Sequence, residues 1–146
     1  MQSIVSETPT VISSPWPTPS LPDADFAAYV LRHAERLADR PALVDAADGR
    51  TIRYGELASA ARRTAAGLAA RGFGRGDVLA LYSPNVPEFV VAVLGAAMTG
   101  GVTTTANPLY TAAELASQLR DSGARIVVTT PPFADCATEA ASSAAV

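Results

Sequence analysis

The chain has 146 residues, of which 49% are hydrophobic and 17% charged, and this composition excludes a wholly disordered protein. Its net charge is −3 and its longest basic cluster is the Arg62–Arg63 pair, which gives no electrostatic footprint for nucleic acid. All 11 basic residues are arginines. Because the sequence contains no lysine, its residues cannot perform any chemistry that needs a lysine side chain. The single cysteine, Cys136, excludes an intrachain disulfide, and the single histidine, His33, excludes the common zinc motifs.

Residues 1–22 are expected to form a flexible or extended arm, because they hold five of the 11 prolines together with many serines and threonines. Trp16 is the side chain that could anchor the arm, and the pattern suits both a docked and a free Trp16. The arm lacks the charged and apolar regions of a secretory signal. The most apolar run, Phe89–Met98, is shorter than the ~20 residues that span a bilayer. We therefore expect a soluble, cytoplasmic protein with no membrane span.

A helix is predicted over Asp23–Ala38, with Asp23 or Asp25 as its N-cap. The residues predicted to share its buried face are Phe26, Val30, Ala34 and Leu37. His33 is expected to be a partly exposed helical residue with no catalytic role.

Two short β segments, Ala42–Asp45 and Thr51–Tyr54, flank Asp48–Gly49, a dipeptide that tolerates positive φ and favours a hairpin. A helix is predicted next over Gly55–Arg71, because apolar residues recur there at helical spacing. The apolar stripe of that helix consists of Leu57, Ala61, Ala65 and Leu68.

Strands and helices then alternate regularly. The strands begin near Val78, Val102 and Ile126, 24 residues apart each time, which fits a strand, a crossover helix and two loops. In chain order the segments are Val78–Tyr82 (strand), Val86–Thr99 (helix), Val102–Thr105 (strand), Ala112–Ser122 (helix), Arg125–Thr130 (strand) and the alanine-rich, weakly helical Phe133–Val146. Two successive βαβ units predict an α/β fold, a layered parallel sheet with flanking helices.

Two helix starts carry capping signals. Asn85 is predicted to cap one helix, with Glu88 completing a capping box. Thr111 and Glu114 form a capping box at the start of the next helix, and Gly123 is expected to end that helix in the left-handed conformation.

The glycine-rich segment Gly72–Gly76 is predicted to be a helix C-cap and tight loop rather than a phosphate-binding loop. It follows a helix and precedes the strand at Val78, whereas a dinucleotide fingerprint follows a strand and opens a helix. Asp77 is expected to be a solvated loop residue, and Cys136 to be an unreactive cysteine. No catalytic residue is predicted in the chain.

The strongest candidate for binding is the loop over residues 103–111, which carries hydroxyls, an amide and an aromatic ring. It follows the carboxyl end of a predicted parallel strand, where open α/β sheets bind ligands. The candidate site residues are Asn107, Tyr110 and Thr111. The pattern also suits an ordinary turn at Asn107–Pro108 with Tyr110 packed inside, so both interpretations stay open.

Three segments, RYGEL, GDVLALYSPNVPEF and TTANPLYT, occur in this order. With them, the chain from about Leu21 to Val146 resembles the amino-terminal part of the 4-coumarate–CoA ligases, which are acyl-adenylate-forming (AMP-binding) enzymes. The resemblance implies a parent that joins a small carboxylic acid, 4-coumarate or a related aromatic or fatty acid, to coenzyme A. That parent would use ATP and magnesium and form an acyl-adenylate first.

The resemblance also implies that residues 23–146 are a partial N-terminal AMP-binding α/β domain, the first subdomain of such an enzyme. We expect this segment to be truncated before the lysine-containing phosphate loop, and to bind no cofactor by itself. By analogy with the family, the loop at Asn107–Thr111 lies on the side from which coenzyme A approaches.

Three functional hypotheses follow from these patterns. The first is an N-terminal fragment of an ATP-dependent carboxylate–CoA ligase, inactive alone, whose exposed apolar surface promotes self-association. The second is a free-standing α/β module that binds a small ligand or a partner through the Asn107–Thr111 loop. The third, a small Rossmann-like enzyme, is disfavoured by the misplaced glycines and by the lack of an acid–base pair.

Overall fold

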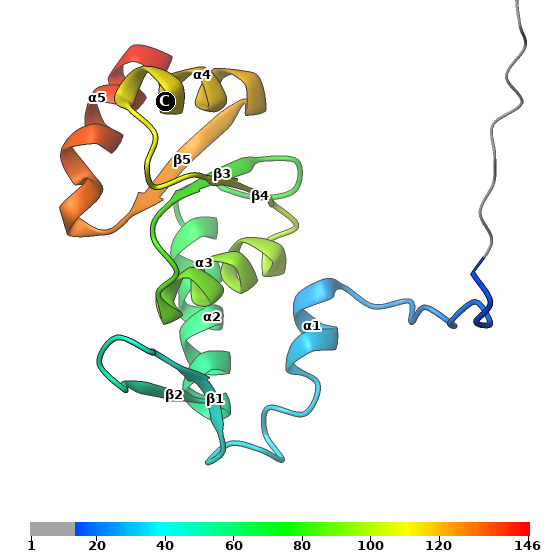
Figure 1. Ribbon diagram of the computed structural model, residues 1–146. Coiled ribbons are helices and arrows are strands. Elements are labelled where there is room, and N and C mark those ends of the chain that lie inside the picture. Colours follow the sequence, from blue (N-terminus) through cyan, green and yellow to red (C-terminus); the bar gives the residue numbers. More distant parts are fainter. Residues whose placement is uncertain (1–13) are drawn as a thin grey trace, which may run out of the picture.

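A computed structural model describes residues 14–146, which form a small parallel sheet with helices around it (Figure 1). In chain order the elements are α1 (Phe26–Leu31), β1 (Pro41–Val44), β2 (Thr51–Arg53), α2 (Tyr54–Ala69), β3 (Val78–Tyr82), α3 (Pro87–Met98), β4 (Val102–Ala106), α4 (Ala112–Ser122), β5 (Ala124–Thr129), the 3-10 turn η1 (Pro131–Phe133) and α5 (Ala134–Ala144). Among the described helices, none is long and apolar enough to cross a membrane.

The parallel sheet has the strand order β4-β3-β5, so β3 is the central strand. Both neighbours run parallel to it, and Leu79 is in register with Thr103 of β4 and Ile126 of β5. The predicted α/β class and the three parallel strands are therefore confirmed. Strand β4 runs one residue further than predicted, and β5 begins and ends one residue earlier.

Side chains of β3 alternate between the two faces of the sheet. Leu79 and Leu81 pack with residues of α3 and with Phe73, whereas Ala80 and Tyr82 pack with residues of α4 and α5. Each of these four side chains of β3 is at most 2% exposed. Helices α4 and α5 thus cover one face, and α3 covers the other (Figure 1). Burial on both faces explains why the sequence of β3 is a continuous apolar run.

The amino-terminal part of the fold packs on the outer side of α3. Leu57 and Ala61 of α2 form a buried cluster with Leu94 of α3, and the hairpin of β1 and β2 packs against the same cluster. The two strands of the hairpin are antiparallel, and Gly49 lies in its turn with φ 76°, which confirms the predicted hairpin.

Helix α1 differs from the prediction. It ends at Leu31, and the chain continues in turns to residue 39, with i to i−3 bonds such as that from the Ala34 amide to the Leu31 carbonyl (2.9 Å). The buried residues are Ala27, Leu31 and Ala34, whereas Phe26 is 60% exposed. The predicted face is therefore correct at Ala34 but wrong at Phe26 and Val30, which are exposed while Ala27 and Leu31 are buried. These two pairs have the same helical spacing, and the pair Ala27 and Leu31 packs inward.

The N-cap of α1 is Asp25, whose carboxylate accepts a hydrogen bond from the Ala28 amide at 2.8 Å. His33 is exposed, as expected, although it lies in a turn rather than in a helix. Trp16 is 79% exposed and therefore does not anchor the arm to the core. Residues 1–13 of the predicted arm, with Pro9, lie outside the described residues.

The predicted Asn85 cap of α3 is wrong. The N-cap is Val86, in extended conformation, and no side chain caps the helix. Asn85 lies one residue too early to reach the first free amides of the helix. Glu88 does not complete a capping box but pairs with Arg50 of the hairpin, with one N–O distance of 3.0 Å.

The second capping box is confirmed. Thr111 Oγ1 accepts a hydrogen bond from the Glu114 amide at 3.4 Å, and the Glu114 carboxylate accepts one from the Thr111 amide at 2.9 Å. Gly123 ends α4 with φ 63°, as predicted.

Close contact between α2 and α3 depends on Gly95, and this contact provides a test of the fold. A Cβ at Gly95 would lie 2.6 Å from Thr64 Cγ2 and 2.7 Å from Thr64 Cβ. We expect Gly95→Ala to lower the free energy of unfolding by about 1–2 kcal/mol, because overpacking outweighs the gain in helix propensity. Urea unfolding measures this change.

Gly74→Ala is the matched control, because a Cβ at Gly74 would meet nothing within 4 Å. The control should unfold like the parent. An equally stable or more stable Gly95→Ala protein would show that α2 and α3 are not packed as described.

Candidate functional site

The loop Asn107–Thr111 joins β4 to α4 at the carboxyl edge of the parallel sheet. The segments that follow β3 and β5 leave the sheet at this same edge, because the three strands are parallel. Ligands of open α/β sheets bind at the carboxyl ends of the strands. The fold therefore places the predicted loop where a binding function is expected.

Local hydrogen bonds shape this loop. The side chain of Asn107 accepts a bond from the Leu109 amide (3.0 Å), and the backbone carbonyl of Asn107 accepts one from the Tyr110 amide (3.0 Å). Thr111 donates from its amide and its hydroxyl to Glu114 Oε2, at 2.9 and 2.8 Å. These bonds, first that of the amide and then that of the hydroxyl, lower the pKa of Glu114. The polar groups of Asn107 and Thr111 thus serve the turn itself.

Tyr82, the last residue of β3, reaches the backbone of this loop. Its hydroxyl oxygen lies 2.9 Å from the carbonyl oxygen of Tyr110 and 3.2 Å from that of Pro108. Cys136 Sγ of α5 lies 3.4 Å from the same hydroxyl and 3.6 Å from the Tyr110 carbonyl oxygen. Three segments that are distant in sequence, β3, the loop and α5, therefore meet at one buried hydroxyl.

The ring of Tyr82 is packed edge to face against Phe133, with the ring centres 5.5 Å apart and an angle of 86° between the planes. The hydrogen bond with Cys136, and then burial, raise the pKa of Tyr82 to about 12. The phenol is therefore a neutral hydrogen-bond donor at ordinary pH. Cys136 is a half-buried member of this cluster rather than an isolated cysteine.

A polar groove of about 620 Å³ opens beside the loop. Its lining residues are Thr104, Tyr110, Glu114, Ser117, Gln118, Asp121 and Ser122. Gln118 donates to the Thr104 hydroxyl (2.9 Å) and to the Thr105 carbonyl (3.0 Å), which ties α4 to β4. The two carboxylates, of Glu114 and Asp121, favour ligand groups that donate hydrogen bonds and disfavour phosphates.

The three predicted site residues thus lie together, but with different surroundings. Asn107 and Thr111 are exposed and their polar groups are bonded within the loop, whereas Tyr110 is half-buried and lines the groove. Leu109 forms the loop tip and is 86% exposed. Sequence patterns alone did not indicate Tyr82 or Gln118 as residues of this site. A tyrosine at the end of the aliphatic run VLALY was the one available signal for Tyr82.

The segment Gly72–Gly76 is a C-terminal cap and loop, as predicted. It joins α2 to the amino end of β3, at the sheet edge opposite to the loop Asn107–Thr111. Its glycine and Phe73 amides are bonded inside the chain: Gly72 to Ala69, Phe73 to Leu68, Gly74 to Asp77, and Gly76 to Gly100. These amides do not fit a phosphate group, because a phosphate cradle needs free amides at a helix N-terminus.

Among residues 14–146, no group of three or more His, Cys, Asp or Glu side chains is placed to hold a metal ion. The glycine amides, which are bonded inside the chain, also offer no cradle for a phosphate. We therefore assign no step of ATP chemistry to them.

Asp77 is not merely a solvated loop residue, which corrects the prediction. Its Oδ2 atom accepts hydrogen bonds from the Gly74 amide (2.8 Å) and from Arg125 (2.7 Å). Arg125 also contacts the Gly72 carbonyl at 3.3 Å. Asp77 therefore fastens the glycine segment to β5. The bond from Arg125 and then that from the Gly74 amide lower the pKa of Asp77.

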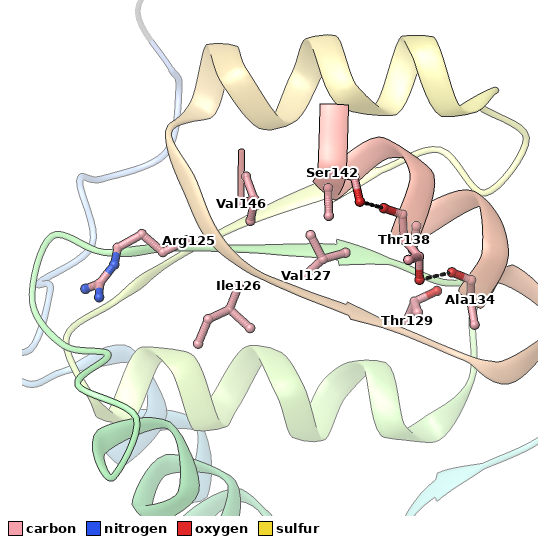
Figure 2. Close-up of a pocket in the computed structure, with 10 residues that line it drawn as sticks. Arg125, Ile126, Val127, Thr129, Ala134, Thr138, Ser142 and Val146 are labelled. Atoms are coloured by element: carbon pink, nitrogen blue, oxygen red, sulfur yellow. Dashed lines mark hydrogen bonds between the residues drawn. The ribbon is translucent and has the colours of Figure 1, made fainter. Parts of the chain in front are cut away.

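A second groove, of about 490 Å³, lies between β5 and α5 (Figure 2). Val127 points toward α5 there, whereas Ile126 points to the opposite side of the sheet (Figure 2). The Thr138 and Ser142 hydroxyls donate to carbonyls of their own helix, both at 2.8 Å. This groove follows the outer edge of β5, which has no partner strand among the described residues. Its character is that of a packing surface rather than a catalytic site.

Comparison with known proteins identifies the family. The family described as AMP-binding enzyme matches residues 30–146. The chain is 39% identical over 130 residues to 4-coumarate-CoA ligase 1 of Narcissus pseudonarcissus, covering 88% of this chain and 24% of that relative. It is 38% identical over 144 residues to 4-coumarate–CoA ligase 3 of Arabidopsis thaliana, covering 91% and 25%. The chain therefore belongs to the AMP-binding enzyme family, which confirms the resemblance noted in its sequence.

Solved structures agree with this assignment. A benzoate CoA ligase from Burkholderia xenovorans LB400 superposes with a TM-score of 0.77 and 34% identity, covering 82% of this chain and 24% of that one. The luciferase-like enzyme of the nonluminescent Zophobas morio mealworm reaches a TM-score of 0.80 at 17% identity, over 88% of this chain and 31% of that one, and shows the fold alone. The chain spans about a quarter of the length of the curated relatives it matches.

The ion pair of Asp77 predicts a pH dependence of stability. The pKa of Asp77 is lower in the folded state than in the unfolded state. The ion pair therefore stabilises the fold at pH values above the unfolded-state pKa, and this stabilisation is lost as the pH falls through the folded-state pKa. We expect Asp77→Asn to be less stable than the parent at pH 7. The difference should shrink below about pH 4. Urea unfolding at several pH values measures it.

Asp121→Asn is a control, because Asp121 is an exposed residue of α4 that belongs to no ion pair among the described residues. A stability difference for Asp77→Asn that does not change with pH would contradict the ion-pair account.

Proposed function

We propose that this chain is the amino-terminal scaffold of an ATP-dependent carboxylate–CoA ligase. The substrate would be 4-coumarate or a related aromatic or fatty acid, joined to coenzyme A through an acyl-adenylate. The observation that carries this proposal is the match to 4-coumarate–CoA ligases over most of the chain, at 38–39% identity in the two relatives compared above. The similarity to a benzoate CoA ligase also supports an aromatic acid.

The described residues contribute architecture rather than catalysis in this proposal. The glycine segment has its amides bonded internally, and the chain contains no lysine. Adenylation needs preorganised positive charge and donors at the α-phosphate. ATP and magnesium would therefore be held by residues outside this chain. Residues 23–146 would form part of an AMP-binding domain, preceded by an arm over residues 1–22.

The Asn107–Thr111 loop would face coenzyme A. Its position at the carboxyl edge of the sheet, with a polar groove beside it, supports this role. Since Glu114 and Asp121 disfavour phosphates, the part of coenzyme A that suits the groove is its neutral amide-bearing arm. Tyr110 is the predicted residue that would contact the arm, while Asn107 and Thr111 maintain the turn.

A free-standing module that binds a small ligand through the same loop is the alternative. The favourable location of the groove supports it as well. The coding DNA downstream distinguishes the two. An in-frame Ser/Thr/Gly-rich loop with a lysine supports the ligase, and a stop codon followed by an unrelated gene supports the module.

A chimera tests the ligase proposal. Residues 21–146 would replace the corresponding segment of a 4-coumarate–CoA ligase, and pyrophosphate exchange and thioester formation would be measured. We expect the chimera to be active and the isolated 146-residue chain to show no acid-dependent exchange. In the chimera, Tyr110→Ala should raise the KM for coenzyme A several-fold and leave pyrophosphate exchange unchanged.

Tyr29→Ala serves as the control in the chimera, because Tyr29 is an exposed residue of α1, far in sequence from the loop. A folded chimera without exchange activity contradicts the ligase assignment. Acid-dependent exchange by the isolated chain contradicts a scaffold role. An unchanged KM for coenzyme A in the Tyr110→Ala chimera contradicts the role of the loop.

We also propose that the isolated chain self-associates. Several large apolar side chains of the arm and α1 are exposed: Trp16, Leu21, Phe26, Tyr29 and Val30. Extended apolar surface drives association. Light scattering should therefore show a mass that increases with concentration, and a Trp16→Ser, Phe26→Ser double variant should reduce the increase. A parent chain that stays monomeric at high concentration and melts cooperatively would refute the proposal.

A further inference from the structure

The hydroxyl of Tyr82 is a buried polar group, and its hydrogen-bond partners all lie in the candidate site or next to it. The side chain is 2% exposed, and its contacts are the carbonyls of Pro108 and Tyr110 and the thiol of Cys136. A buried hydroxyl is costly unless it is hydrogen-bonded. The loop conformation and the burial of this hydroxyl are therefore linked.

We propose that Tyr82 is a positioning residue, whose hydroxyl holds the backbone of the Asn107–Thr111 loop in the conformation that presents Tyr110 to the groove. The importance of this conformation for coenzyme A rests on the proposed function. The positioning itself is a property of this chain and is tested without any ligand.

The atoms available for hydrogen bonding support this assignment. The loop presents two carbonyl oxygens to the interior, and the donors that face them are the O–H of Tyr82 and the S–H of Cys136. The shortest contact, 2.9 Å, joins the Tyr82 hydroxyl to the Tyr110 carbonyl, so this bond has the best distance. The thiol is the weaker donor, at 3.6 Å from the Tyr110 carbonyl. The Tyr82 hydroxyl therefore contributes more than the Cys136 thiol to holding the loop backbone in place.

Packing alone does not require the hydroxyl. The ring of Tyr82 already fills its place against Phe133, and a phenylalanine would keep this contact. The oxygen is thus the part of the side chain that the loop uses. Because the pKa of Tyr82 is raised to about 12, the group remains protonated, and hence a donor, throughout the physiological range.

Tyr82→Phe in the 146-residue chain tests the proposal by hydrogen–deuterium exchange, measured by mass spectrometry at low protein concentration. The variant should increase the exchange rate of peptides that contain the Leu109 and Tyr110 amides by about five-fold, the loss expected for one hydrogen bond. Peptides of β3 and β5 should exchange as in the parent. Tyr54→Phe is the matched control, because the Tyr54 hydroxyl has no partner in the described part of the chain and Tyr54 lies at the start of α2.

Each outcome is decisive. Faster exchange confined to the loop in Tyr82→Phe, and absent in Tyr54→Phe, supports the positioning role. Unchanged loop exchange overturns it, and so does a uniform increase over the whole sheet, which would indicate a purely structural effect. If Tyr82→Phe does not fold, Cys136→Ala replaces it, with the same expected site of faster exchange and a smaller increase. A failure here leaves the coenzyme A test with Tyr110→Ala unaffected, so the two proposals fail separately.

Discussion

The central strand β3 has no solvent-facing side, and this constraint organises the rest of the molecule. Leu79 and Leu81 face one layer of helices, while Ala80 and Tyr82 face the other. Both backbone edges of the strand are also paired, with β4 and β5. A strand in that position must be apolar throughout, and each of the three strands must be connected by a helix that returns to the same end of the sheet.

The candidate site follows from the same constraint. Parallel strands end at a common edge, so the loop after β4 lies beside the last residue of β3. That last residue, Tyr82, points to the face of the sheet that α4 and α5 cover. Its hydroxyl therefore reaches the backbone of the loop, which leads into α4. The glycine segment, by contrast, lies at the amino end of β3, where Asp77 and Arg125 fasten it to β5. The candidate binding loop and the Asp77–Arg125 ion pair thus lie at opposite ends of the three parallel strands.

Local signals predicted the central part of the fold well. The regular spacing of apolar runs gave the three parallel strands, and the Thr111–Glu114 box gave the start of α4, because both signals depend on residues close in sequence. The Asn85 cap was wrong because the helix begins one residue later than the local pattern suggests, and Glu88 forms its ion pair with Arg50, which lies 38 residues away. The face of α1 was wrong at Phe26 and Val30 because Ala27 and Leu31 have the same spacing, and only the neighbouring helices decide between the two pairs.

The site was predictable in part. Position in the chain and composition indicated the loop at Asn107–Thr111, and the structure brings its three candidate residues together. The link from Tyr82 to that loop and to Cys136 joins residues separated by 26 to 54 positions. No local pattern encodes such a link, because it exists only after the sheet has formed.

Residue-resolved amide hydrogen exchange of the parent chain tests the central claim most directly. If β3 is paired on both edges, the consecutive amides of Leu79–Tyr82 are all protected, whereas protection alternates along β4 and β5, whose outer edges are unpaired within the described residues. This is the result we predict. Alternating protection within β3, or unbroken protection along β5, would contradict the account, because either result would place a different strand at the centre of the sheet.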